Sequence, residues 1–178
     1  MPRIALAIGC VVGVVGALAA DQVEAQQRLA QPGDVVKGPA RVTDSDKLVV
    51  DGVYIRLWAV DGPELGQPCF FANGAQYDCQ SIALRELQII TAQGPVTCTI
   101  EQDSSRVRRG RIYGTCKTAD GKDVAEQLVK AGHALAFVDQ SDRYLAAEKV
   151  AEDAKVGLFR GSFQAPWDFA AMIIGGGP

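Results

Sequence analysis

The sequence predicts an α+β domain built around a small, curled antiparallel sheet that could close as a barrel. Five short segments rich in β-branched residues predict strands, and three segments with helical apolar spacing predict helices that follow or interrupt them. If an apolar N-terminal segment of 19 residues is removed, 159 of the 178 residues remain. That length is sufficient for one domain with a sizeable core.

Three strands are expected near the start of the domain, over residues 35–42, 47–50 and 53–60. The pair Asp51-Gly52 lies between two β-branched runs. A type I′ turn needs positive φ at both central residues, and this pair of residues tolerates it. The second and third strands are therefore expected to form a tight hairpin.

Three helices are expected, over residues 81–91, from Asp123 to Gly132, and over residues 142–155. Their apolar residues recur at helical spacing, and each segment ends close to a glycine. Two further strands, over residues 96–101 and 111–117, lie between the first two helices and are joined by a basic loop.

The N-terminus has the features of a secretory signal. Arg3 precedes an apolar stretch over residues 4–20, in which Ala17-Leu18-Ala19 has the small-x-small pattern of a cleavage site. We expect a signal peptide over residues 1–19, cleaved near Ala19, and a secreted or periplasmic protein without a membrane segment. An uncleaved anchor and a lipid on Cys10 are the alternatives.

Cleavage would leave four cysteines, an even number that is typical of disulfides in an oxidising compartment. Three connectivities are possible. We favour Cys69 with Cys79, which closes one loop, and Cys98 with Cys116, which flank a hairpin-like segment. A zinc cluster is the weaker alternative, because these spacings contain no paired Cys-x-x-Cys ligands.

The charged residues limit the chemistry. The net charge is −3, so no global positive field attracts nucleic acid, and any anion site must be local. The single histidine, His133, excludes mechanisms that need a histidine pair. Catalysis, if present, therefore rests on carboxylates and arginines.

Polar residues interrupt segments that otherwise have the pattern of buried strands. Carboxylates suit Ca²⁺ or Mg²⁺, whereas guanidinium groups grip phosphoryl oxygens at two points. Exposed charges and an ordinary Asp-Gly-Pro turn are the plainer interpretation of the same residues. The set comprises Asp44, Asp46, Arg56, Asp61, Glu64 and Arg111.

These residues resemble the staphylococcal nuclease-like, or thermonuclease, family. The family signature Arg-Leu-x-x-x-Asp-x-Pro-Glu is matched by the run from Arg56 to Glu64. Upstream, Asp44-Ser45-Asp46-Lys47 is similar to the family's Asp-Gly-Asp-Thr, and downstream Gly110-Arg111 is similar to its Tyr-Gly-Arg. The resemblance implies a nuclease-like domain over residues 37–167. The polar residues before it indicate a linker over residues 20–36, and the glycine-rich end indicates a disordered tail over residues 168–178.

The fold that the resemblance implies is a five-stranded Greek-key β-barrel of the OB-fold type with three α-helices. The implied reaction is Ca²⁺-dependent hydrolysis of phosphodiester bonds in DNA and RNA, with little sequence specificity. We expect a monomer without a stable protein partner. By resemblance, the metal ligands are Asp46, Asp61 and the Gly62 carbonyl. The catalytic residues are Glu64, which orients or deprotonates the attacking water, and Arg56 and Arg111, which stabilise the phosphoryl charge.

Two residues depart from the family pattern. Ser45 replaces the usual glycine, which would cost about 1 kcal/mol if this position needs positive φ. Lys47 replaces the usual threonine, and an ammonium about 7 Å from Ca²⁺ would repel it by about 1 kcal/mol in a water-like dielectric and about 5 kcal/mol at an effective constant near 20. Adjacent strand residues point to opposite faces, so Lys47 could project away from Asp46 and leave the metal largely undisturbed. We nevertheless expect Lys47 to weaken Ca²⁺ affinity.

Other functions and contacts stay open at this point. A catalytically weakened barrel that binds nucleic acid or protein, and a tethered envelope protein, are alternatives to the nuclease. Arginines in the basic loop could attract phosphate locally, or could simply be solvated. Phe137 could stack on a base, but a buried aromatic is the commoner outcome, and His133 is expected to be structural. The loop arginines are Arg106, Arg108 and Arg109.

Overall fold

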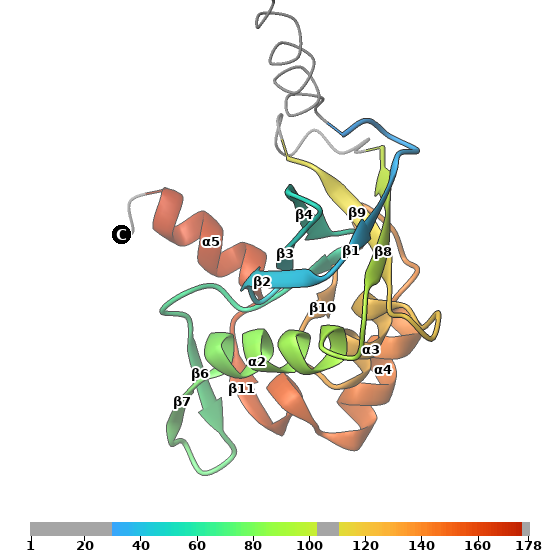
Figure 1. The fold of residues 1–178 in the computed structure, drawn as a ribbon. Helices are drawn as coiled ribbons and strands as arrows, with labels where there is room; N and C mark the ends of the chain where they lie inside the picture. The colour runs from blue at the N-terminus through green and yellow to red at the C-terminus, as the bar shows by residue number, and fades with distance from the viewer. Residues whose placement is uncertain (1–29, 103–110, 176–178) are drawn as a thin grey trace, which may run out of the picture.

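A six-stranded sheet forms the centre of the fold in a computed structural model that describes residues 30–102 and 111–175 (Figure 1). Its strand order is β1-β8-β9-β4-β3-β2, and all neighbours are antiparallel except β4 and β9. The bounds are β1 (Val35–Gly38), β2 (Ala40–Asp44), β3 (Lys47–Val50), β4 (Val53–Leu57), β8 (Val96–Glu101) and β9 (Tyr113–Lys117).

The two outer strands of this sheet are consecutive in the chain. Only Pro39 separates β1 from β2, so the strand expected over residues 35–42 is divided there. Proline has no N–H to donate to a ladder and a fixed φ, which favours such a break. The sheet curls, because its two edge strands, β1 and β2, are joined through Pro39 alone. It does not close into a barrel, because β1 and β2 are not hydrogen-bonded to each other. The expected closed five-stranded barrel is therefore corrected to an open six-stranded sheet.

The turn between β3 and β4 agrees with the sequence. Asp51 and Gly52 have φ values of 49° and 75°, as a type I′ turn requires. The hairpin register pairs Lys47 with Arg56 and Val50 with Val53. This register later places charged side chains of β3 and β4 on one face.

Four α-helices occur in the described residues, one more than the sequence predicts. Two of them begin at aspartate caps: the Asp78 side chain accepts from the Ser81 N–H, and that of Asp123 accepts from the Glu126 N–H. The first three helices match the expected positions within a few residues. The helices are α2 (Cys79–Thr91), α3 (Val124–Lys130), α4 (Leu145–Ala154) and α5 (Pro166–Ile174), with a 3₁₀ turn η1 (Gly157–Arg160).

Helix α5 occupies most of the segment that was expected to be a disordered tail. Pro166 stands at its N-terminus, where a missing N–H is tolerated, and Phe169 is buried against the rest of the domain. Burial of this ring stabilises the helix, whereas the glycine-rich end of the sequence indicated only disorder. Residues 176–178 lie outside the described part of the chain.

Two smaller sheets complete the fold. β5 (Val60–Asp61) pairs with β10 (Leu135–Ala136), and β6 (Pro68–Phe71) lies between β7 (Gln76–Asp78) and β11 (Gly161–Phe163). The sequence does not predict β6, β7, β10 or β11. These strands are short, and their pairing joins distant parts of the chain.

Both expected disulfides are present. Cys69–Cys79 links β6 to the start of α2, and Cys98–Cys116 joins directly opposed residues of β8 and β9. All four side chains are buried. Disulfides persist in secreted and periplasmic proteins, which agrees with the expected oxidising compartment. The signal segment and Cys10 lie outside the described residues.

The main core lies between the curled sheet and helices α2 and α3 (Figure 1). It is formed by large apolar side chains, including Leu48, Ile55, Leu57, Leu87 and Leu128, all of which are 0 or 1% exposed. Within residues 30–102 and 111–175, no helix has both the length and the apolar character needed to cross a bilayer.

Candidate active site

Arg56 on β4 joins two buried carboxylates that come from different elements. Its Nε lies 2.7 Å from Asp46 Oδ2, and its terminal nitrogen donates to Asp61 Oδ1. Asp46 lies in the turn before β3, and Asp61 ends β5. Burial opposes the charged guanidinium, but Asp46 and Asp61 outweigh it and raise the pKa of Arg56.

Asp61 is held at its position by an unusual backbone. Ala59, two residues earlier, has a φ of 57°, which L-residues other than asparagine and aspartate adopt rarely. Its N–H donates to Gln140 Oε1 at 2.9 Å, and its carbonyl accepts from the Phe137 N–H at 2.9 Å. The segment after β10 therefore fixes the entry to β5. Gln140 had no signal in the sequence.

The loop after Asp61 packs tightly against the turn that carries Asp46. The Ser45 hydroxyl donates to the Pro63 carbonyl at 2.9 Å. A Cβ on Gly62 would lie 2.5 Å from Ser45 Oγ, so this close approach requires glycine. Ser45 is not among the positive-φ residues of the described chain, so the strain expected for serine there is wrong.

Glu64 is oriented through a buried glutamine. Its N–H donates to Gln67 Oε1 at 3.0 Å, and Gln67 Nε2 donates to the Gln164 carbonyl at 2.8 Å. Gln67 is only 4% exposed. Gln67 thus joins the Glu64 loop to the segment before α5. No pattern in the sequence indicated this role.

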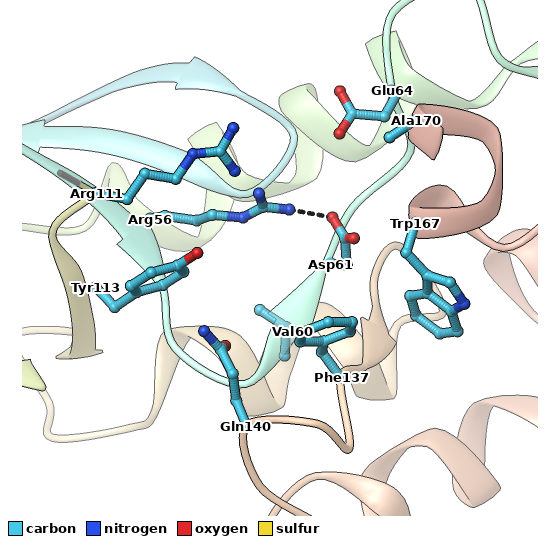
Figure 2. Close-up of a pocket in the computed structure, with 10 residues that line it drawn as sticks. All are labelled: Arg56, Val60, Asp61, Glu64, Arg111, Tyr113, Phe137, Gln140, Trp167 and Ala170. Carbon is cyan, nitrogen blue, oxygen red and sulfur yellow. Dashed lines mark hydrogen bonds and ion pairs between the residues drawn. The ribbon is translucent and has the colours of Figure 1, made fainter. Parts of the chain in front are cut away.

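These side chains surround a small pocket of about 50 Å³. Figure 2 shows the guanidinium groups of Arg56 and Arg111 on one side and the carboxylates of Asp61 and Glu64 on the other. Tyr113, Phe137, Gln140 and Trp167 complete much of the wall. The structure therefore brings four of the six charged residues singled out in the sequence to one place, together with Phe137, and adds Trp167 from the unexpected helix α5.

Comparison with known proteins shows the family of this chain. The model of a family described as staphylococcal nuclease homologue matches residues 54–160. The chain belongs to this staphylococcal nuclease homologue family. A similar protein is the succinoglycan biosynthesis protein ExoI of Rhizobium meliloti (strain 1021), which is 33% identical over 133 residues, or 74% of this chain and 68% of that protein.

Two buried carboxylates of this nuclease homologue, Asp46 and Asp61, carry oxygens of the kind that divalent cations bind, and the Arg56 guanidinium pairs with both of them. Asp46 Oδ2 is buried and, although close to Arg56 Nε, has no aligned hydrogen bond. Hard oxygen donors of this kind suit Ca²⁺. Within residues 30–102 and 111–175, no group of three or more histidine, cysteine, aspartate or glutamate side chains is arranged to hold a metal ion.

Lys47 lies on the same side as the carboxylates. Its Nζ is 3.5 Å from Asp46 Oδ1 and pairs with Asp44 Oδ2. Of the two directions that the sequence left open for Lys47, the structure shows the one toward Asp46. Asp46 belongs to the turn, so the two-residue alternation of a strand does not apply to it. Despite burial, Asp46 and Asp44 raise the pKa of Lys47.

Asp61 has an unusual protonation equilibrium in this nuclease homologue without metal. Burial raises its pKa from 3.8 to about 7, although Arg56 opposes the shift, and Asp46 and Glu64 add to it. The folded state thus binds the proton more tightly than the unfolded state, so the free energy of unfolding falls as pH rises through this interval.

We expect the urea midpoint, measured in chelator, to decrease between about pH 4 and about pH 7 more steeply in the wild type than in Asp61→Asn. The variant has no carboxyl group at this position, so it lacks the contribution that the raised pKa of Asp61 makes to the pH dependence of stability. Equal slopes in the two proteins would contradict the raised pKa.

The remaining candidate arginines, at positions 106, 108 and 109, lie outside the described residues.

Proposed function

We propose that this protein is a Ca²⁺-dependent nuclease that hydrolyses phosphodiester bonds of DNA and RNA in the periplasm or outside the cell. The observation that carries the proposal is the pocket in which Arg56 and Arg111 face Asp61 and Glu64. Family membership and the two disulfides support it.

The arginines are suited to the phosphate. A guanidinium group stays charged at all relevant pH values and offers paired N–H donors to two phosphoryl oxygens. Arg56 is fixed by Asp46 and Asp61, whereas Arg111 is exposed. Such fixed charge is most effective where negative charge builds up during the reaction.

Glu64 is the proposed acceptor of the proton from the attacking water. Its carboxylate faces the pocket in Figure 2, and the contact with Gln67 orients its backbone. A carboxylate within reach of the water removes its proton as the water oxygen bonds to phosphorus. The P–O bond to the leaving group breaks, and the departing oxygen takes up a proton from solvent. The groups at the pocket contact phosphate rather than base edges, which favours low sequence specificity.

Asp46, Asp61 and the Gly62 carbonyl would hold the Ca²⁺ ion. Bound there, the ion supplies a Lewis acid that polarises a phosphoryl oxygen. Both carboxylates are buried, Asp46 at 1% and Asp61 at 6% exposure, and such groups are stabilised by a nearby cation.

The proposal predicts that purified protein cleaves single-stranded DNA and RNA in millimolar Ca²⁺ and loses this activity in excess chelator. Activity should return when Ca²⁺ is restored, because the chelator removes only the cation. Gel assays of both polymers, with the protein recovered from the culture medium or periplasm, measure this. Full activity in chelator would contradict the proposed metal dependence.

The second candidate is a nuclease-like domain that binds nucleic acid or protein without cutting. Lys47 favours it, since its ammonium partly neutralises Asp44 and Asp46 where the family commonly has threonine. The name of the relative, a succinoglycan biosynthesis protein, also describes a role other than nucleic-acid hydrolysis for that protein. Binding of oligonucleotides without cleavage at any Ca²⁺ concentration would support this candidate.

A further inference from the structure

A second recess adjoins the active-site pocket on the outer face of β2, β3 and β4. We name it the outer groove; its volume is about 350 Å³. It is lined by Thr43, Lys47, Tyr54, Arg56 and Arg111, with Ile55 and Ile112. None of the described residues that line it is acidic, so it differs from the pocket that contains Asp61 and Glu64.

Strand register explains why cations gather on this face. Lys47 is opposite Arg56, and Val49 is opposite both Tyr54 on β4 and Arg41 on β2. Side chains two residues apart on a strand share a face. Arg41, Lys47, Tyr54 and Arg56 therefore lie on the same outer surface of the curled sheet, where the three strands are neighbours in Figure 1.

Tyr54 is an exposed aromatic residue in this cationic surface. Its side chain is 66% exposed, and the Arg41 guanidinium lies 5.9 Å from its ring centroid. An exposed ring beside cations is the arrangement with which proteins bind single-stranded nucleic acid: the ring stacks on a base and the cation attracts the backbone. Packing of the domain core does not account for this ring.

Arg56 and Arg111 line both the pocket and the outer groove. A phosphate held by the two arginines would therefore have a recess on each side. The pocket, at about 50 Å³, is too small to enclose a nucleoside, whereas 350 Å³ lies within the range of small-molecule sites. The outer groove thus has the volume, charge and aromatic surface for the neighbouring nucleotide.

On the basis of the proposed function, we propose that the outer groove is a substrate subsite for the nucleotide next to the scissile phosphate. The base stacks on Tyr54, and the following phosphate lies near Arg41. Because a stacked base must be unpaired, the preferred substrate is single-stranded or locally melted. A chain that continues through the groove is cut internally rather than only at its end.

Binding of a fluorescein-labelled eight-residue oligothymidylate, measured by anisotropy in chelator, tests the subsite without cleavage. Tyr54→Ala is expected to weaken binding on the order of tenfold, and Tyr54→Phe, which keeps the ring, to bind within about twofold of the wild type. Arg41→Ala should reduce the salt dependence of binding by about one phosphate contact, whereas Arg85→Ala, an exposed residue of α2 that does not line the groove, should not.

Several outcomes would overturn the subsite. Binding by Tyr54→Ala within twofold of wild type would do so, as would an equal loss in Tyr54→Phe. Displacement of the oligonucleotide by an acidic polysaccharide at equal concentration, with the same dependence on Tyr54, would assign the groove to another polymer. If the wild type cleaves DNA while Tyr54→Ala binds normally, only the subsite fails; if the wild type neither binds nor cleaves, the proposed function fails with it.

Discussion

Replacement of Glu64 by glutamine, or of Arg111 by alanine, is expected to lower the rate of phosphodiester hydrolysis at least a hundredfold at saturating Ca²⁺. Loss of a positioned base or of a charge that stabilises the transition state has an effect of about this size. Glu64 is only partly buried and Arg111 is exposed, so neither change should disturb the core. Initial rates on single-stranded DNA, compared at equal protein concentration, measure the effect.

Matched controls are available on the same chain. Arg85→Ala and Glu152→Gln alter exposed residues on α2 and α4, away from the pocket, and should cleave DNA at the wild-type rate. Circular dichroism and thermal melts should be the same for all four variants. Near-normal cleavage by both Glu64→Gln and Arg111→Ala would contradict the proposed catalytic roles of these two residues.

Arg56 differs from the other two catalytic candidates because it also supports the fold. Its side chain is 12% exposed and bridges Asp46 and Asp61, so Arg56→Ala would leave buried Asp61 without its cation and Asp46 with Lys47 alone. We expect a similar loss of turnover together with a destabilisation of about 3 kcal/mol. Urea unfolding separates this variant from Arg111→Ala, in which the midpoint should stay unchanged.

Replacement of Lys47 by threonine is expected to tighten Ca²⁺ binding by about 5- to 150-fold. The ammonium lies 3.5 Å from Asp46 Oδ1, on the side where the cation would bind. A repulsion between about 1 and 3 kcal/mol corresponds to this change in the dissociation constant. Calorimetric titration with Ca²⁺ in the absence of substrate measures it directly.

Two features separate this electrostatic effect from a change in folding. Monovalent salt screens charges at a partly exposed site, so the advantage of Lys47→Thr should shrink as ionic strength rises. Lys149→Thr, which removes an exposed lysine of α4, should leave Ca²⁺ affinity unchanged. An unaltered constant in Lys47→Thr would show that the ammonium does not oppose the metal.

Local sequence patterns were sufficient to predict the strands and helices whose ends are marked by turn-forming or capping residues. Asp51-Gly52 predicted the hairpin because only a few residues tolerate positive φ in succession, and this constraint is local. The disulfide between Cys98 and Cys116 was predicted for a related reason, since a hairpin of β8 and β9 places the two residues opposite each other.

Helix α5 and the small sheet of β6, β7 and β11 could not be predicted in this way. Phe169 stabilises α5 only because it is buried against residues distant in the chain, and β11 forms only where it reaches β6. Contacts between distant segments leave no periodic signal in either segment. Trp167 therefore lines the pocket without having been expected there.

The sequence by itself determined which chemical groups the site contains: the motif from Arg56 to Glu64, with Asp46 and Arg111, supplies carboxylates and guanidinium groups. We propose that the carboxylates bind a cation and the guanidinium groups a phosphate. Only the tertiary structure decided how they face one another. Asp46 stands in a turn rather than a strand, which directs Lys47 toward the carboxylates, and Arg56 lies between Asp46 and Asp61. Residue identity is local information, but the charge that each buried group meets depends on which distant elements pack beside it.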